Sequence, residues 1–486
     1  MTPLHYRSSH ELIDLLQSKA CSSEALLTHF VERVQTHNPA INAVAVLDLD
    51  RAFEQARFAD AQLARGETLG PLHGLPMTVK ESFDLTGTPT TWGFAHLRDN
   101  MATQTATSVA RLQAAGAVVF GKTNVPVALA DWQTFNPIYG TTCNPWDLGR
   151  TPGGSSGGSA AALAAGLTPL ELGSDIGASI RNPAHYCGVY GHKPTWGVVP
   201  MAGHTLPGIV CIDSLDIAVA GPLARSARDL QLAMNVLCTP LQHFGQTGWQ
   251  NAAWRQSSRS ARQCRVSIVF DDAQARVDDR IQSRLHDLAD FLRREGVHVQ
   301  ENHRPVDSAH SHRVYLYLLR SATGAMLDDA AYADMQQAVA QLPPELDTTR
   351  ERTWRAITLT HRDWVAFDQQ RAALRAQWHA FFEHTDLLIA PIATSPAFEH
   401  NQVGERWDRM IHVNGQPQPS TDALFWAGYP GVVGLPATAI PMGTTPEGLP
   451  VGAQIIGNHF ADPLCLEMAQ WLETHWCGFT APPAFA

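Results

Sequence analysis

Two serines, Ser155 and Ser179, stand in glycine-rich loops a short distance apart in the sequence. The first lies in the run Thr-Pro-Gly-Gly-Ser-Ser-Gly-Gly-Ser at 151–159, and the second follows Asp-Ile-Gly-Ala at 175–178. Because glycine has no Cβ, such loops let several backbone N–H groups converge on one point. Each loop can therefore present a reactive hydroxyl together with hydrogen-bond donors.

The chain between the two serines predicts how they meet. Ser159 is a predicted N-cap, and the alanine-rich stretch 160–165 predicts a short helix that Gly166 closes. Residues 167–173 read as a short buried strand. A crossover helix runs antiparallel to the strands, so the start of the helix and the end of the strand share one sheet edge. Ser155 and Ser179 are expected together at that edge.

Lys80 is expected at the same edge, because the predicted strand 75–79 ends on it. A serine hydroxyl needs a base to become a good nucleophile, and a lysine serves only when desolvation pulls its pKa far below about 10.4. The neighbours Pro76, Met77 and Val79 are apolar. The constellation predicts acyl transfer, with Ser179 as nucleophile, Ser155 as proton relay and Lys80 as base.

The loop that leads into Ser179 supplies the remaining parts of such a site. Backbone N–H groups of Ile176, Gly177, Ala178 and Ser179 are predicted to form an oxyanion hole, in which one donor is worth roughly 3 kcal/mol. Three further residues are predicted to support the loop, Asp175 and Arg181 as a structural ion pair together with Ser156.

These segments resemble the amidase signature family of Ser-cisSer-Lys hydrolases. The resemblance extends through further blocks along most of the chain, at 121–124, 187–194, 221–225, 435–438 and 448–454. It implies the amidase signature fold, an α/β/α sandwich with a mixed central β-sheet covered by helices. It also implies a cis peptide bond between Gly154 and Ser155. Two positions depart from the family pattern: Ala178 stands where a second glycine is usual, and Val127 where an acidic residue is frequent.

The implied activity is hydrolysis of the carbon–nitrogen acyl bond of a linear small-molecule amide through a Ser179 acyl-enzyme, without a cofactor. Two alternatives share the pattern. One is the amidase subunit of a tRNA-dependent amidotransferase, which delivers ammonia to a partner protein; the other is a non-catalytic binding protein on the same fold. A phosphate loop of the Walker type is disfavoured, because Gly158-Ser159-Ala160 lacks the lysine.

Composition and short motifs bear on which partners, location and metals to expect. The net charge of −11 argues against nucleic acid. No apolar run reaches the roughly 18 residues of a membrane span, and residues 1–6 lack a signal-peptide pattern, so a cytoplasmic location is expected. The eight cysteines form no Cys-x-x-Cys pair and His310-Ser-His312 lacks a His-Glu-x-x-His helix, so no metal is expected. A homodimer stays open.

Outside the serine loops, the spacing of apolar residues predicts helices alternating with strands in one domain over residues 1–486. Helices are predicted at 11–16, 24–34, 108–115 and 463–475, and strands at 117–120, 265–270, 387–391, 437–442 and 453–457. The polar stretch 241–263 reads as a long surface connection. Two amphipathic stretches, 278–294 and 350–382, predict a helical cap region within 271–385, its tryptophans packed in the core rather than against substrate.

Overall fold

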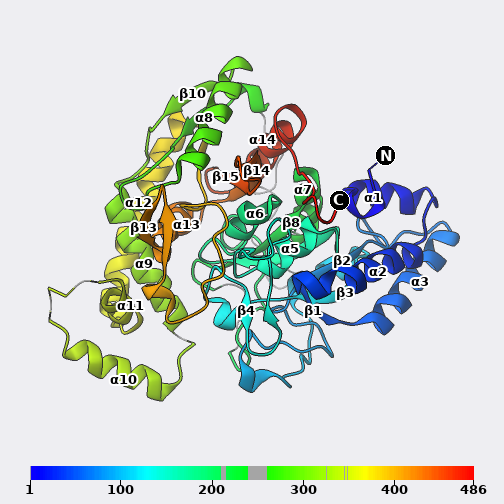
Figure 1. The fold of residues 1–486 in the computed structure, drawn as a ribbon, viewed down its shortest axis with the longest axis horizontal. Coiled ribbons are helices and arrows are strands. Elements are labelled where there is room, and N and C mark those ends of the chain that lie inside the picture. The colour runs from blue at the N-terminus through cyan, green and yellow to red at the C-terminus, as the bar shows by residue number, and fades with distance from the viewer. Residues whose placement is uncertain (1, 210–214, 239–259, 325, 344, 347) are drawn as a thin grey trace, which may run out of the picture.

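A single mixed β-sheet runs through the molecule. The computed structural model describes residues 2–209, 215–238, 260–324, 326–343, 345–346 and 348–486. Within these residues, eleven strands form this sheet (Figure 1). Their order is β1 (Val44–Leu47), β3 (Val118–Thr123), β2 (Pro76–Lys80), β6 (Leu170–Asp175), β8 (Val219–Ala224), β7 (Tyr190–Lys193), β14 (Ala437–Thr444), β15 (Pro450–Ile456), β11 (Leu387–Pro391), β9 (Arg265–Ile268) and β10 (His298–Glu301).

The sheet mixes parallel and antiparallel pairs. Strands β3, β2 and β6 pair in parallel, as do β11, β9 and β10, and the remaining neighbours are antiparallel. Every residue of β2, β3, β6 and β8 is buried. Strands buried on both faces are expected where helices cover a sheet on both sides. The predicted mixed sheet covered by helices is therefore confirmed.

Helices pack on this sheet and on one another. Helices α5 and α6 contact the central strands, and α7 and α14 pack together and contact β7, β8, β14 and β15. The helices are α1 (Ser9–Gln17), α2 (Ser23–Ile41), α3 (Leu49–Ala64), α4 (Thr107–Ala114), α5 (Gly157–Ala164), α6 (Arg181–Cys187), α7 (Ala227–Leu237), α8 (Asp279–Arg294), α9 (Ser308–Gly324), α10 (Asp329–Ala340), α11 (Thr349–Ile357), α12 (His361–His384), α13 (Leu424–Gly431) and α14 (Asp462–His475).

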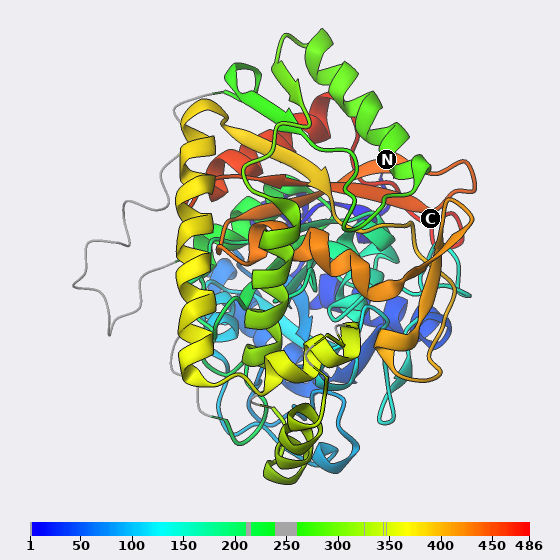
Figure 2. The ribbon, with the colours of Figure 1, turned by 90° about the vertical axis from the view of Figure 1, so that its left-hand side faces the viewer.

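Helix α9 is the centre of a helical layer at one side of the molecule. It packs against α11, α12 and α13, and Figure 2 shows this side facing the viewer, with α12 as the long yellow helix. The approach of α13 depends on Gly428, because a Cβ there would overlap the ring of Tyr315 on α9. Two short hairpins in the described residues lie outside the main sheet, β4 (Phe135–Asn136) with β5 (Gly140–Thr141) and β12 (Met410–Val413) with β13 (Gln416–Pro419).

Most predicted elements are present, with shifted ends. Ser22 is the cap of α2, since its hydroxyl accepts a hydrogen bond from the Ala25 N–H. The predicted start of α5 is wrong: the helix begins at Gly157, and Ser159 bonds to Thr123 instead of capping. Glycine is needed in this first turn, because a Cβ at Gly157 would overlap Thr134. Strand β6 also continues two residues beyond its predicted end.

The helical stretch predicted at 350–382 is in fact two helices. Helix α11 ends at Ile357, and α12 begins anew after Thr360, whose hydroxyl accepts a hydrogen bond from the Asp363 N–H. The surface connection predicted at 241–263 lies, up to residue 259, outside the described residues. The single domain and the cap region within 271–385 stay predictions.

The two ends of the chain lie together, since the Tyr6 hydroxyl donates to the carbonyl of Phe485 over 2.8 Å.

Candidate active site

Lys80 ends strand β2 and is completely buried. Its Nζ donates hydrogen bonds to Ser155 Oγ at 2.7 Å and to Ser174 Oγ at 3.0 Å. Burial lowers the pKa of Lys80 to about 7, although the nearby carboxylates of Asp175 and Glu171 act in the opposite direction. Near neutral pH this amine is therefore available to accept a proton.

Ser155 lies just before the first turn of α5, and the Gly154–Ser155 peptide bond is cis, so that prediction is confirmed. The two serine loops are joined by their backbones, because the Ser156 N–H donates to the carbonyl of Ser179 over 3.1 Å. The Ser156 hydroxyl donates to the carbonyl of Ser174 at 3.3 Å. Ser156 thus ties the first loop to the second loop and to the end of β6.

Ser179 lies in the loop between β6 and α6 and lines the same cavity as Ser155. Among the described residues, neither hydroxyl donates a hydrogen bond, and Ser155 accepts the bond from Lys80. Catalytic hydrogen bonds often form only when substrate is bound. The structure brings the three predicted groups to one sheet edge.

Two side chains from other parts of the chain orient the nucleophile loop, which is the segment 176–180 between β6 and α6 that carries Ser179. Tyr315 Oη donates to the carbonyl of Ile176 at 2.9 Å, and Trp132 Nε1 donates to the carbonyl of Gly177 at 2.8 Å. In a planar trans peptide the N–H points away from the carbonyl oxygen. The N–H of Gly177 is therefore directed away from Tyr315, and the N–H of Ala178 away from Trp132.

The donor set predicted for the oxyanion hole needs one correction. The N–H of Ala178 donates to Asp175 Oδ1 at 2.9 Å, so this donor is already engaged. The N–H groups of Ile176, Gly177 and Ser179 have no acceptor within the described part of the chain. Ala178 also has a φ of 65°, in the left-handed region that favours glycine.

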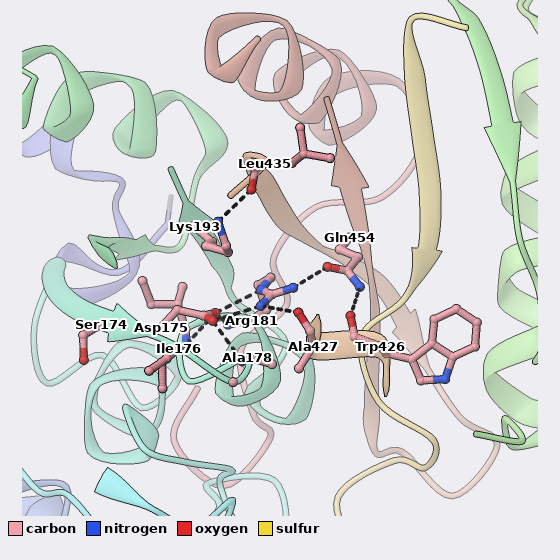
Figure 3. Close-up of polar contacts among 12 residues, drawn as sticks. Ser174, Asp175, Ile176, Ala178, Arg181, Lys193, Trp426, Ala427, Leu435 and Gln454 are labelled. Carbon is pink, nitrogen blue, oxygen red and sulfur yellow. Dashed lines mark hydrogen bonds and ion pairs between the residues drawn. The ribbon is translucent and has the colours of Figure 1, made fainter. Parts of the chain in front are cut away.

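A buried ion pair stands behind the nucleophile loop (Figure 3). Arg181 contacts both carboxylate oxygens of Asp175 at 2.9 Å, and both side chains are fully buried. Burial alone would raise the pKa of Asp175, but the Arg181 guanidinium lowers it below its ordinary value. Arg181 also donates to Gln454 Oε1 at 2.7 Å and to the carbonyl of Ala427 at 3.1 Å. The predicted structural ion pair is present.

A further buried lysine lies close to this pair. Lys193 Nζ donates to the carbonyls of Leu435 at 2.7 Å and Pro194 at 3.1 Å (Figure 3). Burial and the charge of Arg181 lower the pKa of Lys193 to about 7. Its amine bonds only to backbone carbonyls among the described residues, so it has no contact with the two serines.

A cavity of about 750 Å³ opens above the serines. Its size suits a small organic molecule, since ligand pockets are typically about 300–1,000 Å³. Much of its wall is aromatic or aliphatic, contributed by Trp92, Phe94, Leu129, Trp132, Ile176, Leu206, Leu319, Met335, Trp354, Ile357, Trp407 and Leu424. Trp354 therefore lines the cavity, whereas Trp378 of α12 is fully buried in the core.

Several residues of this site are not predicted by the sequence patterns. Those patterns place Ser174 in a loop, although it is the last residue but one of β6 and holds Lys80. Tyr315 is far from the serine loops in the sequence, and Trp132 lies outside both glycine-rich runs, 19 residues before the first of them, so no spacing pattern marks either residue. Gln454 lies in the block 448–454 that carries the family resemblance, and this block is the one signal that points to it.

Neither a metal site nor a membrane span is found where the structure describes the chain. No group of three or more histidine, cysteine or carboxylate side chains is arranged to hold a metal ion there. No helix there is both long and apolar enough to cross a bilayer.

Comparison with known proteins adds independent findings. A family model described as Amidase matches residues 25–466. The chain is 31% identical to an acylamidase of Rhodococcus erythropolis over 472 residues, covering 96% of this chain and 94% of that protein. It is 30% identical to a glutamyl-tRNA(Gln) amidotransferase subunit of Bdellovibrio bacteriovorus over 495 residues, covering 97% of each.

One solved structure supports the fold. A bacterial aryl acylamidase of the amidase signature family superposes with a TM-score of 0.80, and the match covers 98% of this chain and 97% of that one. The sequence identity is 24%, so this likeness speaks for the fold only.

Proposed function

The chain belongs to the amidase family, and on this premise we propose that it is an amidohydrolase of linear small-molecule amides. The reaction runs through an acyl-enzyme on Ser179, with Ser155 as proton relay and Lys80 as base. The proposal includes the cytoplasmic location and the absence of a nucleic-acid partner that the sequence predicts.

In the first half-reaction, neutral Lys80 accepts the proton of Ser155 while Ser155 takes the proton of Ser179. The Ser179 oxygen attacks the amide carbonyl carbon and forms a tetrahedral intermediate. When the carbon–nitrogen bond breaks, the proton returns from Lys80 through Ser155 to the leaving amine. Water then attacks the ester in the same way and releases the acid, which restores all three side chains.

The negative oxygen of the tetrahedral intermediate needs donors that are held in place beforehand. We assign this role to the N–H groups of Ile176, Gly177 and Ser179, and exclude Ala178 because Asp175 occupies its N–H. Tyr315 and Trp132 hold the carbonyl side of the loop, which leaves the loop little freedom to turn.

The observation that carries this proposal is the contact of a buried lysine amine with Ser155 Oγ at 2.7 Å. Burying an amine without a carboxylate partner costs stability unless its pKa falls. A binding protein would gain nothing from a low-pKa amine beside two serines, whereas a base for serine catalysis needs one. This argues against the non-catalytic alternative.

The relatives include both an acylamidase and an amidotransferase subunit, so they leave the amidotransferase alternative open. The cavity favours hydrolysis of free amides, because its large aromatic wall suits an organic group bigger than a primary amide alone.

The purified chain should be assayed alone on a panel of aryl, alkyl and primary amides, with Ser179→Ala as control. Turnover by the native chain and none by the variant supports the proposal. If no amide is cleaved by the chain alone but a primary amide is cleaved after a partner is added, the amidotransferase role is correct instead.

A further inference from the structure

One cationic side chain in the cavity wall has no partner in the described part of the chain. Arg320 lies on α9, is only 7% exposed, and lines the cavity that also contains Ser179. Among the described residues its guanidinium forms no ion pair and no hydrogen bond, and its Nε is buried without an acceptor. A buried charge without a partner is costly, so natural proteins keep such groups for a purpose.

The carboxylates of the cavity wall do not neutralise Arg320. Asp328 is exposed and caps α10 by accepting from the Ala331 N–H at 2.8 Å. The other carboxylates of the wall are each paired with a different arginine, in the pairs Asp131–Arg409, Asp175–Arg181 and Asp216–Arg371. The wall therefore keeps a positive charge.

A second guanidinium adds to this charge. Arg406 also lines the cavity; it donates to the carbonyl of Ala130 and lies 5.8 Å from the ring centre of Trp407, without an ion pair in the described chain. Burial, followed by the charge of Arg406, lowers the pKa of Arg320 to about 9. Arg320 thus keeps its proton at neutral pH while it lies near a like charge.

We propose that Arg320, assisted by Arg406, binds a carboxylate of the substrate, so that the substrate class is an amide that also carries a carboxylate. This inference rests on the proposed amidase function. A guanidinium binds a carboxylate through two parallel hydrogen bonds, and no described residue engages the donors of Arg320. The apolar residues of the cavity wall suit the carbon chain that joins the amide to the carboxylate.

Helix α9 carries both Arg320 and a residue that orients the nucleophile loop. Tyr315 of α9 holds the nucleophile loop at Ile176, and Arg320 follows five residues later. At 1.5 Å per residue the two positions lie about 7.5 Å apart along the helix axis. Five residues also turn the two side chains about 140° apart around the helix axis, so we choose short dicarboxylic acids of two lengths for the test.

The test compares matched chromogenic amides. The mono-4-nitroanilides of succinic and glutaric acid carry a carboxylate, and the 4-nitroanilides of butanoic and pentanoic acid have the same chain length without it. The native chain should prefer the anionic members in kcat/KM. Arg320→Met should reduce this preference about 10- to 100-fold, as expected for a hydrogen-bonded charge pair, and Arg320→Lys should restore part of it. Arg313→Met, an exposed site on the same helix, should leave the preference unchanged.

A binding measurement separates this inference from the proposed function. Free glutarate should raise the melting temperature of Ser179→Ala but not that of Ser179→Ala with Arg320→Met. If neutral anilides are cleaved and Arg320→Met prefers the anionic anilides as strongly as the native chain does, the inference is overturned while the amidase function stands. The amidase proposal fails only if no amide of the wider panel is cleaved. If other amides are cleaved but no anilide is, the glutarate measurement decides the carboxylate site, and equal melting shifts in both samples would overturn it.

Discussion

Protonation of Lys80 should control the rate of this enzyme near neutral pH. Its amine is fully buried and contacts Ser155, and burial lowers its pKa to about 7. Only the neutral amine accepts the proton that Ser179 must lose. We therefore predict that kcat/KM rises with pH and reaches a plateau above about 7, because kcat/KM reports the free enzyme.

The size of the effect follows from the pKa. With a pKa of about 7, roughly one molecule in ten has a neutral Lys80 at pH 6, about half at pH 7 and about nine in ten at pH 8. Below pH 6 the rate should thus fall about tenfold per pH unit. A lysine with an ordinary pKa of about 10.4 would show no plateau below pH 10.

Other groups near the site must be separated from Lys80. His204 is excluded, because burial, followed by the charge of Lys80, lowers its pKa to about 3. Lys193 and Glu171 titrate in the same range, since burial brings their pKa values to about 7 and about 8. The profile should be recorded for Lys193→Met and Glu171→Gln, and both should keep the rise and the plateau. In Glu171→Gln the midpoint should stay close to the native value, because a carboxyl with a pKa of about 8 is mostly protonated and uncharged where Lys80 titrates.

The assay is steady-state hydrolysis of one amide from pH 5 to pH 9, with the melting temperature measured in the same buffers. Lys80→Met should lose about 10²- to 10⁴-fold in kcat, the usual contribution of a general base. A flat profile over this range, or a rise that disappears in Lys193→Met, would refute the assignment of the base to Lys80.

Three further predictions concern residues other than Lys80 and the two serines. Ser174→Ala should lower kcat several-fold, because Lys80 loses one of its two acceptors, while circular dichroism stays unchanged; a kcat equal to the native value would contradict this role. Arg181→Met should lower the free energy of unfolding by about 3–5 kcal/mol in urea titrations, because it leaves buried Asp175 without its partner; a loss under 1 kcal/mol would argue against it. Trp378→Ala should cost about 3–5 kcal/mol of stability, whereas Trp354→Ala should mainly change KM, and the reverse pattern would exchange their roles.

The positions of the three reacting groups are predictable from the sequence, because each group lies at the end of a strand or the start of a helix in neighbouring α/β units. Lys80 ends a strand, and Ser155 and Ser179 flank one helix–strand unit, so the topology of α/β units already brings them to one edge. The cis bond at Ser155 follows from the family resemblance and not from these residues alone.

The surroundings of the serines are less predictable, because they depend on contacts between distant segments. Tyr315 and Trp132 reach the nucleophile loop from other parts of the fold, and no periodicity in the sequence marks them. From the sequence alone, the N–H of Ala178 is predicted to be an oxyanion donor. In the folded loop this N–H turns toward Asp175, and no local sequence pattern indicates that turn. The start of α5 is missed for a similar reason, because glycine is required there by a neighbour, Thr134, and not by the helix itself.

The most direct test of the proposed mechanism is detection of the acyl-enzyme. The chain is mixed with an amide in large excess, quenched in acid within one turnover, digested, and analysed by mass spectrometry. We predict the mass of the acyl group on the peptide that contains Ser179, and no such mass in Ser179→Ala. An acyl group found on Ser155 instead, or turnover retained by Ser179→Ala, would contradict the mechanism.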